Sequence, residues 1–198
     1  MARKAKSREG WVAAMLFVTT YVFMLRLQSE ALPISKNKTA AHHLGQEAVV
    51  TLEGEEVVLR LERRKNWQNG SVIRRKCWCD SCSQTCPIHV VWKFFSDLPD
   101  GAQPFAAISY QDALMQLRGS MAILGVKAHN TYGTQDLRRG HAQDLKAAGA
   151  SEDTIRLAGQ WKGRRGPMPY MDIPANESEM VSKAHANMEA RCSLARWF

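Results

Sequence analysis

The change of hydrophobic periodicity along the chain is the feature that most constrains its fold. Residues 49–61 and 71–73 are rich in β-branched and apolar residues, and Glu53 with Gly54 supplies a tight turn inside the first run. From residue 109 onward, apolar side chains recur at spacings of three and four: Tyr110, Leu114, Leu117, Met121 and Leu124. The first half therefore predicts a small antiparallel sheet and the second half predicts helices. We expect an α+β domain that is mainly helical.

Five helices are expected from the apolar spacing and the capping residues. They cover residues 9–25, 109–124, 135–148, 151–159 and 176–195. The first is apolar nearly all round, as expected of a helix buried in a domain centre. The residues expected to cap the next three helices are Ser109, Thr134 and Ser151. The last helix is amphipathic, and we expect it to dock on its own body or to mediate self-association with a second copy of the chain.

The balance of charge points to a polyanionic partner. Lys and Arg outnumber Asp and Glu by 27 to 19 among 198 residues, which gives a net charge of +8. Binding of a basic surface to phosphates is favoured because it releases counterions. The apolar and charged fractions favour neither a disordered chain nor a membrane protein. We expect one domain over residues 1–198, with a core of about 9–190 and a basic tail of 1–8.

The N-terminus allows a second interpretation, because a basic opening followed by the apolar stretch 11–25 is similar to a signal peptide. That stretch is short for a membrane span, and it continues into Arg26 and Glu30 without a small-residue cleavage site. A buried helix that ends at a functional arginine explains the same residues better. We therefore expect a protein that is not secreted and has no membrane partner.

A cysteine cluster lies in the middle of the chain. Five of its residues are of the types that bind zinc: Cys77, Cys79, Cys82, Cys86 and His89. Their close spacing is not that of a disulfide framework and favours a reducing compartment. We expect residues 77–89 to form an insertion. Its cysteines and histidine are suited to a structural zinc site, or the cysteines are free thiols in part of a strand, and both alternatives stay open.

Two segments carry residues suited to phosphate chemistry. Arg26 ends the first predicted helix and precedes a Ser-Glu-Ala-Leu run. Farther along, Gln135 precedes Arg138 by three positions, and Trp161 follows Arg138 by 23. Tyr170 follows Trp161 by nine. Each residue alone has an ordinary structural explanation, but the joint spacing points to one site.

In order and spacing these segments resemble the two signature boxes of the tyrosine recombinases of the phage-integrase family. The similarity is closest to the eukaryotic Crypton-type recombinases, in which an Arg-Lys-Asn hairpin, a Cys-x-Cys and a Cys-Pro-x-His also follow. Here these motifs are residues 64–66, 77–79 and 86–89. The resemblance covers about 9–190. It implies the fold of a recombinase catalytic domain, a double-stranded DNA partner and no required cofactor.

The resemblance implies DNA strand cleavage and rejoining, as in site-specific recombination or DNA integration by a mobile element. Arg26 and Arg138 would hold the non-bridging oxygens of the scissile phosphate with planar, bidentate donors. Tyr170 would attack phosphorus and leave a 3′-phosphotyrosyl link, so that religation needs neither ATP nor a metal. The expected location is the nucleus in a eukaryote and the cytoplasm otherwise.

Other residues take supporting roles by the same analogy. Lys65, at the entry to the hairpin, is the expected general acid for the leaving 5′-oxygen, with Lys76 as a weaker candidate. Trp161 would donate its indole N–H to a phosphate oxygen. Gln135 departs from the usual His or Lys and cannot shuttle protons, so we expect reduced activity, with His141 nearby by accident. Further DNA contacts are expected from Arg63, Arg64, Arg139, Lys162, Arg164 and Arg165.

Three functions from different classes stay open. The first is an active DNA strand transferase, and the second is a DNA-binding remnant of a mobile-element recombinase with weakened or lost catalysis. The third is a membrane-anchored or zinc-organised interaction protein. Members of the family carry a helical core-binding domain ahead of the catalytic one. This chain starts about eight residues before its first predicted helix, so we expect that domain to be absent.

Overall fold

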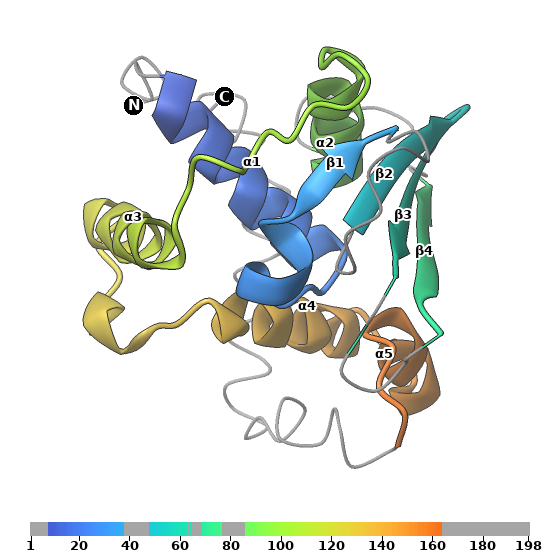
Figure 1. The fold of residues 1–198 in the computed structure, drawn as a ribbon. Helices are drawn as coiled ribbons and strands as arrows, with labels where there is room; N and C mark the ends of the chain where they lie inside the picture. Colours follow the sequence, from blue (N-terminus) through green and yellow to red (C-terminus); the bar gives the residue numbers. More distant parts are fainter. Residues whose placement is uncertain (1–7, 38–47, 63, 65–68, 77–85, 164–198) are drawn as a thin grey trace.

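The computed structural model describes residues 8–37, 48–62, 64, 69–76 and 86–163. Five α-helices and four strands lie in these ranges (Figure 1). The strands are β1 Ile34–Lys36, β2 Ala48–Glu53, β3 Glu56–Leu61 and β4 Ser71–Lys76. The helices are α1 Arg8–Val22, α2 Pro87–Ser96, α3 Tyr110–Ile123, α4 Gln135–Ala147 and α5 Glu152–Ala158. Two short turns of other helical types cover Leu27–Ala31 (π) and His129–Thr131 (3₁₀).

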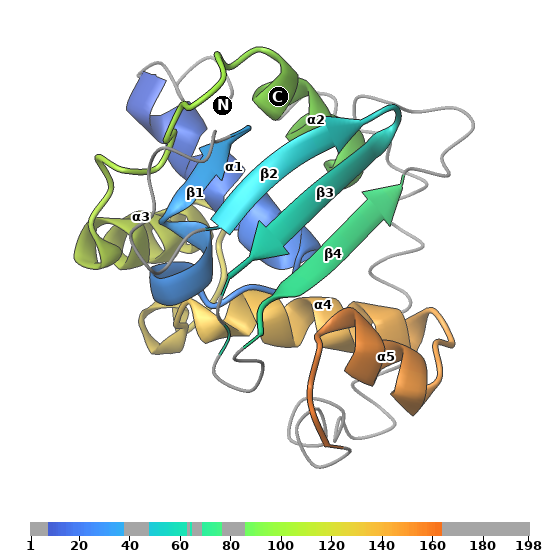
Figure 2. The ribbon, with the colours of Figure 1, turned by 45° about the vertical axis from the view of Figure 1, so that its right-hand side comes forward.

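The sheet has the strand order β1-β2-β3-β4 and is mixed (Figure 2). Strands β2, β3 and β4 are antiparallel, and β2 and β3 meet in the predicted hairpin, where Gly54 adopts a φ of +60°. Strand β1 pairs in parallel with β2. The prediction of a purely antiparallel sheet is therefore wrong at one edge. The α+β class is confirmed.

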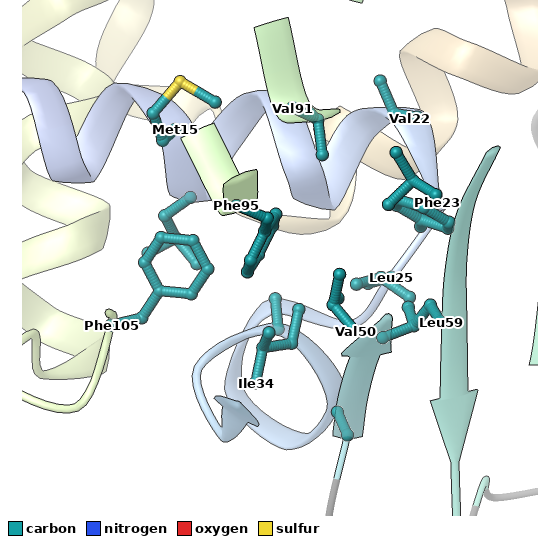
Figure 3. Packing of buried hydrophobic residues seen from close by; sticks show 14 of the residues in the cluster. Met15, Val22, Phe23, Leu25, Ile34, Val50, Leu59, Val91, Phe95 and Phe105 are labelled. Carbon is teal, nitrogen blue, oxygen red and sulfur yellow. The ribbon is translucent and has the colours of Figure 1, made fainter. Parts of the chain in front are cut away.

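The core lies between the sheet and helices α1 and α2, which cover the same face of the sheet (Figures 1 and 2). Phe23 and Leu25 follow α1 and reach toward Val50 and Leu59 of the sheet, while Phe95 enters from α2 (Figure 3). Burial of these side chains supplies the main driving force for folding. Helix α2 was not predicted from the sequence.

The described residues between Tyr110 and Ala158 are mainly helical, as predicted. Ser109 accepts a hydrogen bond from the Asp112 N–H at 3.1 Å at the start of α3, and Ser151 caps α5 in the same way. Thr134 is the N-cap residue of α4, as predicted, but its side chain makes no cap hydrogen bond. The Asp136 carboxylate instead accepts the N–H of Gly133 at 2.8 Å. The predicted helix 176–195 lies outside the described residues.

The first helix ends three residues earlier than the predicted boundary at 25. After Val22 the chain turns through Met24, which has a φ of +52°, and Arg26 then adopts an extended conformation. Within the described parts of the chain, no helix has the length and apolar character needed to cross a membrane. Arg26 pairs with Glu30, and Glu30 pairs with Arg64 just after β3, so Arg26 lies near the end of the sheet where β3 ends and β4 begins. Helices α4 and α5 lie beside this end of the sheet (Figure 2).

Candidate functional site

Arg26 is held by a buried carboxylate from the next turn. Glu30 accepts the backbone N–H of Arg26 at 2.9 Å and its Nη1 at 3.2 Å. The buried side chains of Leu25 and Leu27 fix the backbone on either side of Arg26. The side chain of Arg26 is 27% exposed, whereas that of Glu30 is 2% exposed. Arg26 therefore presents part of an oriented guanidinium to solvent.

Glu30 also binds Arg64, which follows β3. The Nε and Nη2 atoms of Arg64 donate to the two carboxylate oxygens at 3.0 and 2.9 Å, a bidentate pair with both side chains 2% exposed. Burial alone would raise the pKa of Glu30. The hydrogen bonds and charges of Arg64 and Arg26 outweigh burial and hold that pKa below its usual value. Glu30 is therefore a stable carboxylate between two guanidiniums.

Arg64 extends the contact to the segment that follows α5. Its Nη1 donates to the Gln160 side-chain oxygen at 3.0 Å, and the Gln160 Nε2 donates to the Val72 carbonyl of β4 at 3.2 Å. Gln160 has a φ of +50°, a left-handed conformation that is costly for a residue with a side chain. The two hydrogen bonds of the Gln160 side chain stabilise this strained backbone conformation and so offset part of its cost.

Arg138, on α4, lies against Trp161. Its guanidinium carbon is 4.4 Å from the centroid of the indole ring, and its Nη2 donates to the Gly159 carbonyl at 2.6 Å. A Cβ on Gly159 would lie 1.9 Å from an atom of the Trp161 ring, so this close approach requires glycine. Trp161 itself packs in a second apolar cluster with Met24 and Ile155. Arg138 is 4% exposed, and both the ring of Trp161 and the carbonyl of Gly159 hold its guanidinium in place.

These contacts form one connected network from Arg26 to Arg138. It runs through Glu30 and Arg64 to Gln160, which precedes Trp161 in the chain. The structure thus brings together three of the residues singled out by spacing: Arg26, Arg138 and Trp161. Sequence reasoning missed Glu30, Gly159 and Gln160. The Ser-Glu-Ala-Leu run and the Gly-Gln-Trp triplet were visible signals for them.

Two predicted residues lie on the surface of α4. Gln135 is the first residue of the helix, is exposed and lies one turn before Arg138. Arg139 is also exposed and pairs with Asp136 at 3.0 Å. Lys162 is exposed just after Trp161. Arg64, which was also expected to contact DNA, is instead buried against Glu30.

Several predicted residues lie outside the described parts of the chain. They are Arg63, Lys65, Cys77, Cys79, Cys82, Arg164, Arg165 and Tyr170. Of the cysteine cluster, Cys86 is the N-cap of α2 and His89 lies in its first turn. Among the described residues, no group of three or more potential metal ligands is present.

His141 and Arg75 have structural environments beside the network. The His141 Nδ1 is 2.8 Å from the Tyr21 carbonyl oxygen. Burial and the nearby charge of Arg75 lower the pKa of His141 to about 4, so the ring is neutral near pH 7. Arg75 donates to the carbonyls of Val22 and Ala158, which ties β4 to the ends of α1 and α5.

The network carries more positive than negative charge, with three guanidiniums and one carboxylate. Such an arrangement favours an anion with several oxygen acceptors, such as a phosphodiester. Comparison with models of protein families, with curated proteins and with solved structures finds no match.

Proposed function

We propose that the protein cleaves and rejoins DNA strands through a 3′-phosphotyrosyl intermediate with Tyr170 as the nucleophile. The observation that best supports this proposal is the network that joins Arg26 to Arg138 and Trp161, although Arg26 lies more than 100 positions from both in the sequence. The choice of Tyr170 as the nucleophile rests on the resemblance of the sequence to tyrosine recombinases. The protein would act on DNA in the nucleus of a eukaryotic cell or in the cytoplasm otherwise.

Each group has a defined part in the proposed reaction. The Tyr170 oxygen forms a bond to phosphorus while the bond from phosphorus to the 5′-oxygen breaks. Guanidiniums of Arg26 and Arg138 and the indole N–H of Trp161 stabilise the charge that grows on the non-bridging oxygens. Lys65 gives a proton to the leaving 5′-oxygen, and the Tyr170 proton passes to solvent. Rejoining reverses these steps, so the phosphotyrosyl bond conserves the energy of the phosphodiester.

A second candidate function is DNA binding with weak or absent cleavage. One observation favours it: Gln135 has no titratable proton to assist catalysis. In this function the arginines would bind phosphates without a reaction at Tyr170.

A suicide substrate with a nick near the cleavage site distinguishes the two functions. Cleavage releases a short 5′-hydroxyl fragment that diffuses away, which traps the covalent protein–DNA adduct. We expect the wild-type protein to form an adduct that survives denaturation, and Tyr170→Phe to abolish it while DNA affinity is retained. Tyr132→Phe is the matched control, because its side chain lies outside the network and should leave the adduct intact.

Other outcomes select among the functions. DNA binding without any adduct favours the binding function. An adduct that still forms with Tyr170→Phe would show that the nucleophile is another residue. Tyr21 is a poor alternative nucleophile, because its burial and the hydrogen bond that it donates to Asp144 raise its pKa above the usual value. Absence of both binding and adduct rejects DNA as the partner.

A further inference from the structure

Arg64 differs from the other two arginines of the network in its charged partner, because its guanidinium forms a bidentate pair with the buried carboxylate of Glu30. Its side chain is 2% exposed, and its Nε, Nη1 and Nη2 atoms all donate to protein acceptors. A DNA phosphate can recruit this guanidinium only by breaking a buried bidentate pair, which leaves the buried Glu30 carboxylate with the partly exposed Arg26 as its remaining charged partner. Arg64 is therefore poorly placed for direct phosphate contact.

The acceptors of Arg64 belong to the two halves of the candidate site. Glu30 orients Arg26 through both its backbone N–H and its guanidinium. Gln160 immediately precedes Trp161, against which Arg138 stacks. The guanidinium of Arg64 thus spans the gap between the segment that positions Arg26 and the segment that positions Arg138.

We propose that Arg64 is a positioning residue that sets the spacing between Arg26 and the Arg138–Trp161 pair, and that it does not contact DNA. This inference rests on the proposed function, because the spacing matters only if both arginines bind one phosphate. In such reactions a misplacement of about 1 Å costs about 10²-fold in rate. The rigid fork of a guanidinium holds Glu30 and Gln160 at fixed separation, which the single flexible ammonium of lysine cannot do.

A positional role also explains why so polar a cluster is buried. Buried ion pairs contribute little net stability compared with apolar side chains, because desolvation offsets the attraction between the charges. Gln160 meanwhile keeps a left-handed backbone conformation that its contacts to Arg64 and Val72 hold in place. The buried Glu30–Arg64 pair and the left-handed backbone of Gln160 both cost free energy, and both hold Arg64 in the same position. This indicates that the position of Arg64 has a function.

The test compares Arg64→Lys and Gln160→Leu with the wild-type protein. Arg64→Lys keeps a positive charge beside Glu30 and loses the fork, and Gln160→Leu removes the other end of the bridge. The measurements are the rate of adduct formation at saturating nicked DNA, the dissociation constant for the same DNA and its salt dependence. Arg74→Lys is the matched control, since Arg74 lies on β4 in an exposed ion-pair cluster with Glu53 and Glu56.

Each single variant should form the adduct about 10²-fold more slowly, with the dissociation constant and its salt dependence unchanged. The double variant should be no slower than either single one, because both changes break the same bridge. Arg74→Lys should behave as wild type. If Arg64→Lys does not fold, the Gln160→Leu measurement decides, since Gln160 is only half-buried and its loss leaves no buried charge.

Three results overturn the inference. Weaker DNA binding by Arg64→Lys with an unchanged rate at saturating DNA identifies Arg64 as a DNA contact. An unchanged rate and an unchanged affinity in both folded variants identify the bridge as merely structural. A wild-type protein that forms no adduct overturns the proposed function, and the inference with it, before any variant is considered.

Discussion

The guanidinium of Arg138 is stacked on the indole of Trp161, with 4.4 Å between its central carbon and the ring centroid. A cation over an indole contributes about 0.5–1 kcal/mol when exposed and about 2 kcal/mol when desolvated. Both side chains here are almost fully buried. Trp161 therefore orients Arg138 and also fills the small apolar cluster with Met24, Ala142 and Ile155.

Two substitutions of Trp161 should show how much the packing of its ring contributes to the free energy of unfolding, compared with its indole N–H. Trp161→Ala should lower the free energy of unfolding by about 3–5 kcal/mol, the usual cost of removing a large buried aromatic side chain. Trp161→Phe keeps a ring under Arg138, so its loss should be smaller, although the indole N–H is gone. Urea denaturation measures both. A loss below about 1 kcal/mol in Trp161→Ala, typical of an average substitution, would show that the cluster is not part of the cooperative core.

Local sequence patterns predicted the helices α1, α3, α4 and α5 and the β2–β3 hairpin. Strand β1 and helix α2 were not predicted, for different reasons. Strand β1 has only three residues, and its pairing with β2 depends on a partner 14 positions away, as in Ile34 with Ala48. Helix α2 carries a short apolar run that includes Val90 and Val91, and periodicity cannot distinguish such a run from a buried strand.

Residues of the candidate site could be predicted where their type and spacing in the sequence carry the signal. They could not be predicted where their role depends on a contact between distant parts of the chain. Arg26, Arg138 and Trp161 were predicted because their residue types and intervals in the sequence resemble the pattern of the tyrosine recombinases. Arg64 was expected on the surface because it lies in a basic run. It is buried because the carboxylate of Glu30, 34 positions earlier, neutralises it inside the fold. Such a partner is visible only once the chain is folded.

The stability of the protein should depend on pH through His141. Burial lowers its pKa in the folded protein to about 4, below the usual 6.5 of the unfolded chain. As the pH falls from 6.5 to 4, the unfolded chain binds a proton that the folded protein excludes, so stability is lost in this window. The loss should reach up to about 3 kcal/mol. Urea denaturation at several pH values between 4 and 7 measures it.

The control for this prediction is His141→Asn, which can donate to the Tyr21 carbonyl but does not titrate. This variant should lose most of the pH dependence between 6.5 and 4, even if it is less stable at pH 7. An equal slope in both proteins would assign the acid sensitivity to other groups.

Metal removal tests the cysteine cluster. If Cys86 and His89 hold a zinc ion together with other cysteines of the 77–89 segment, the ion contributes to folding and takes no part in the DNA chemistry. Chelation should then lower the melting temperature, and re-addition of zinc should restore it. Metal analysis of protein purified without added zinc should give one equivalent. A value well below one, with no effect of chelator, would leave the cysteines as free thiols.

DNA binding should show little sequence preference and a strong dependence on salt, because the basic residues are suited to phosphates rather than to base edges. With about 6–10 phosphate contacts, affinity should fall by about 10³–10⁵ between about 50 and 200 mM salt. Fluorescence anisotropy with two unrelated duplexes measures both properties. A dissociation constant that does not change with salt over this range would contradict a phosphate-dominated interface.

Gln135 is the position at which the sequence departs most clearly from what the proposed catalysis requires. It is exposed at the start of α4, one turn before Arg138. A side-chain amide can hold a phosphate oxygen but has no titratable proton, and acid–base assistance is typically worth about 10²–10⁴ in rate. Gln135→His introduces a group with a usual pKa near 6.5. We expect faster formation of the Tyr170 adduct with little change in DNA affinity.

Single-turnover cleavage of a nicked substrate, at matched DNA occupancy, compares the two proteins. The conservative control is Gln135→Asn, which keeps an amide but is shorter, and which should not accelerate the reaction. If Gln135→His cleaves no faster than wild type, the glutamine is not what limits catalysis. If neither protein cleaves although both bind DNA, titratable chemistry at this position cannot rescue the reaction. The defect then lies at a position other than Gln135, and the binding function becomes the better account of the Arg26–Arg138 network.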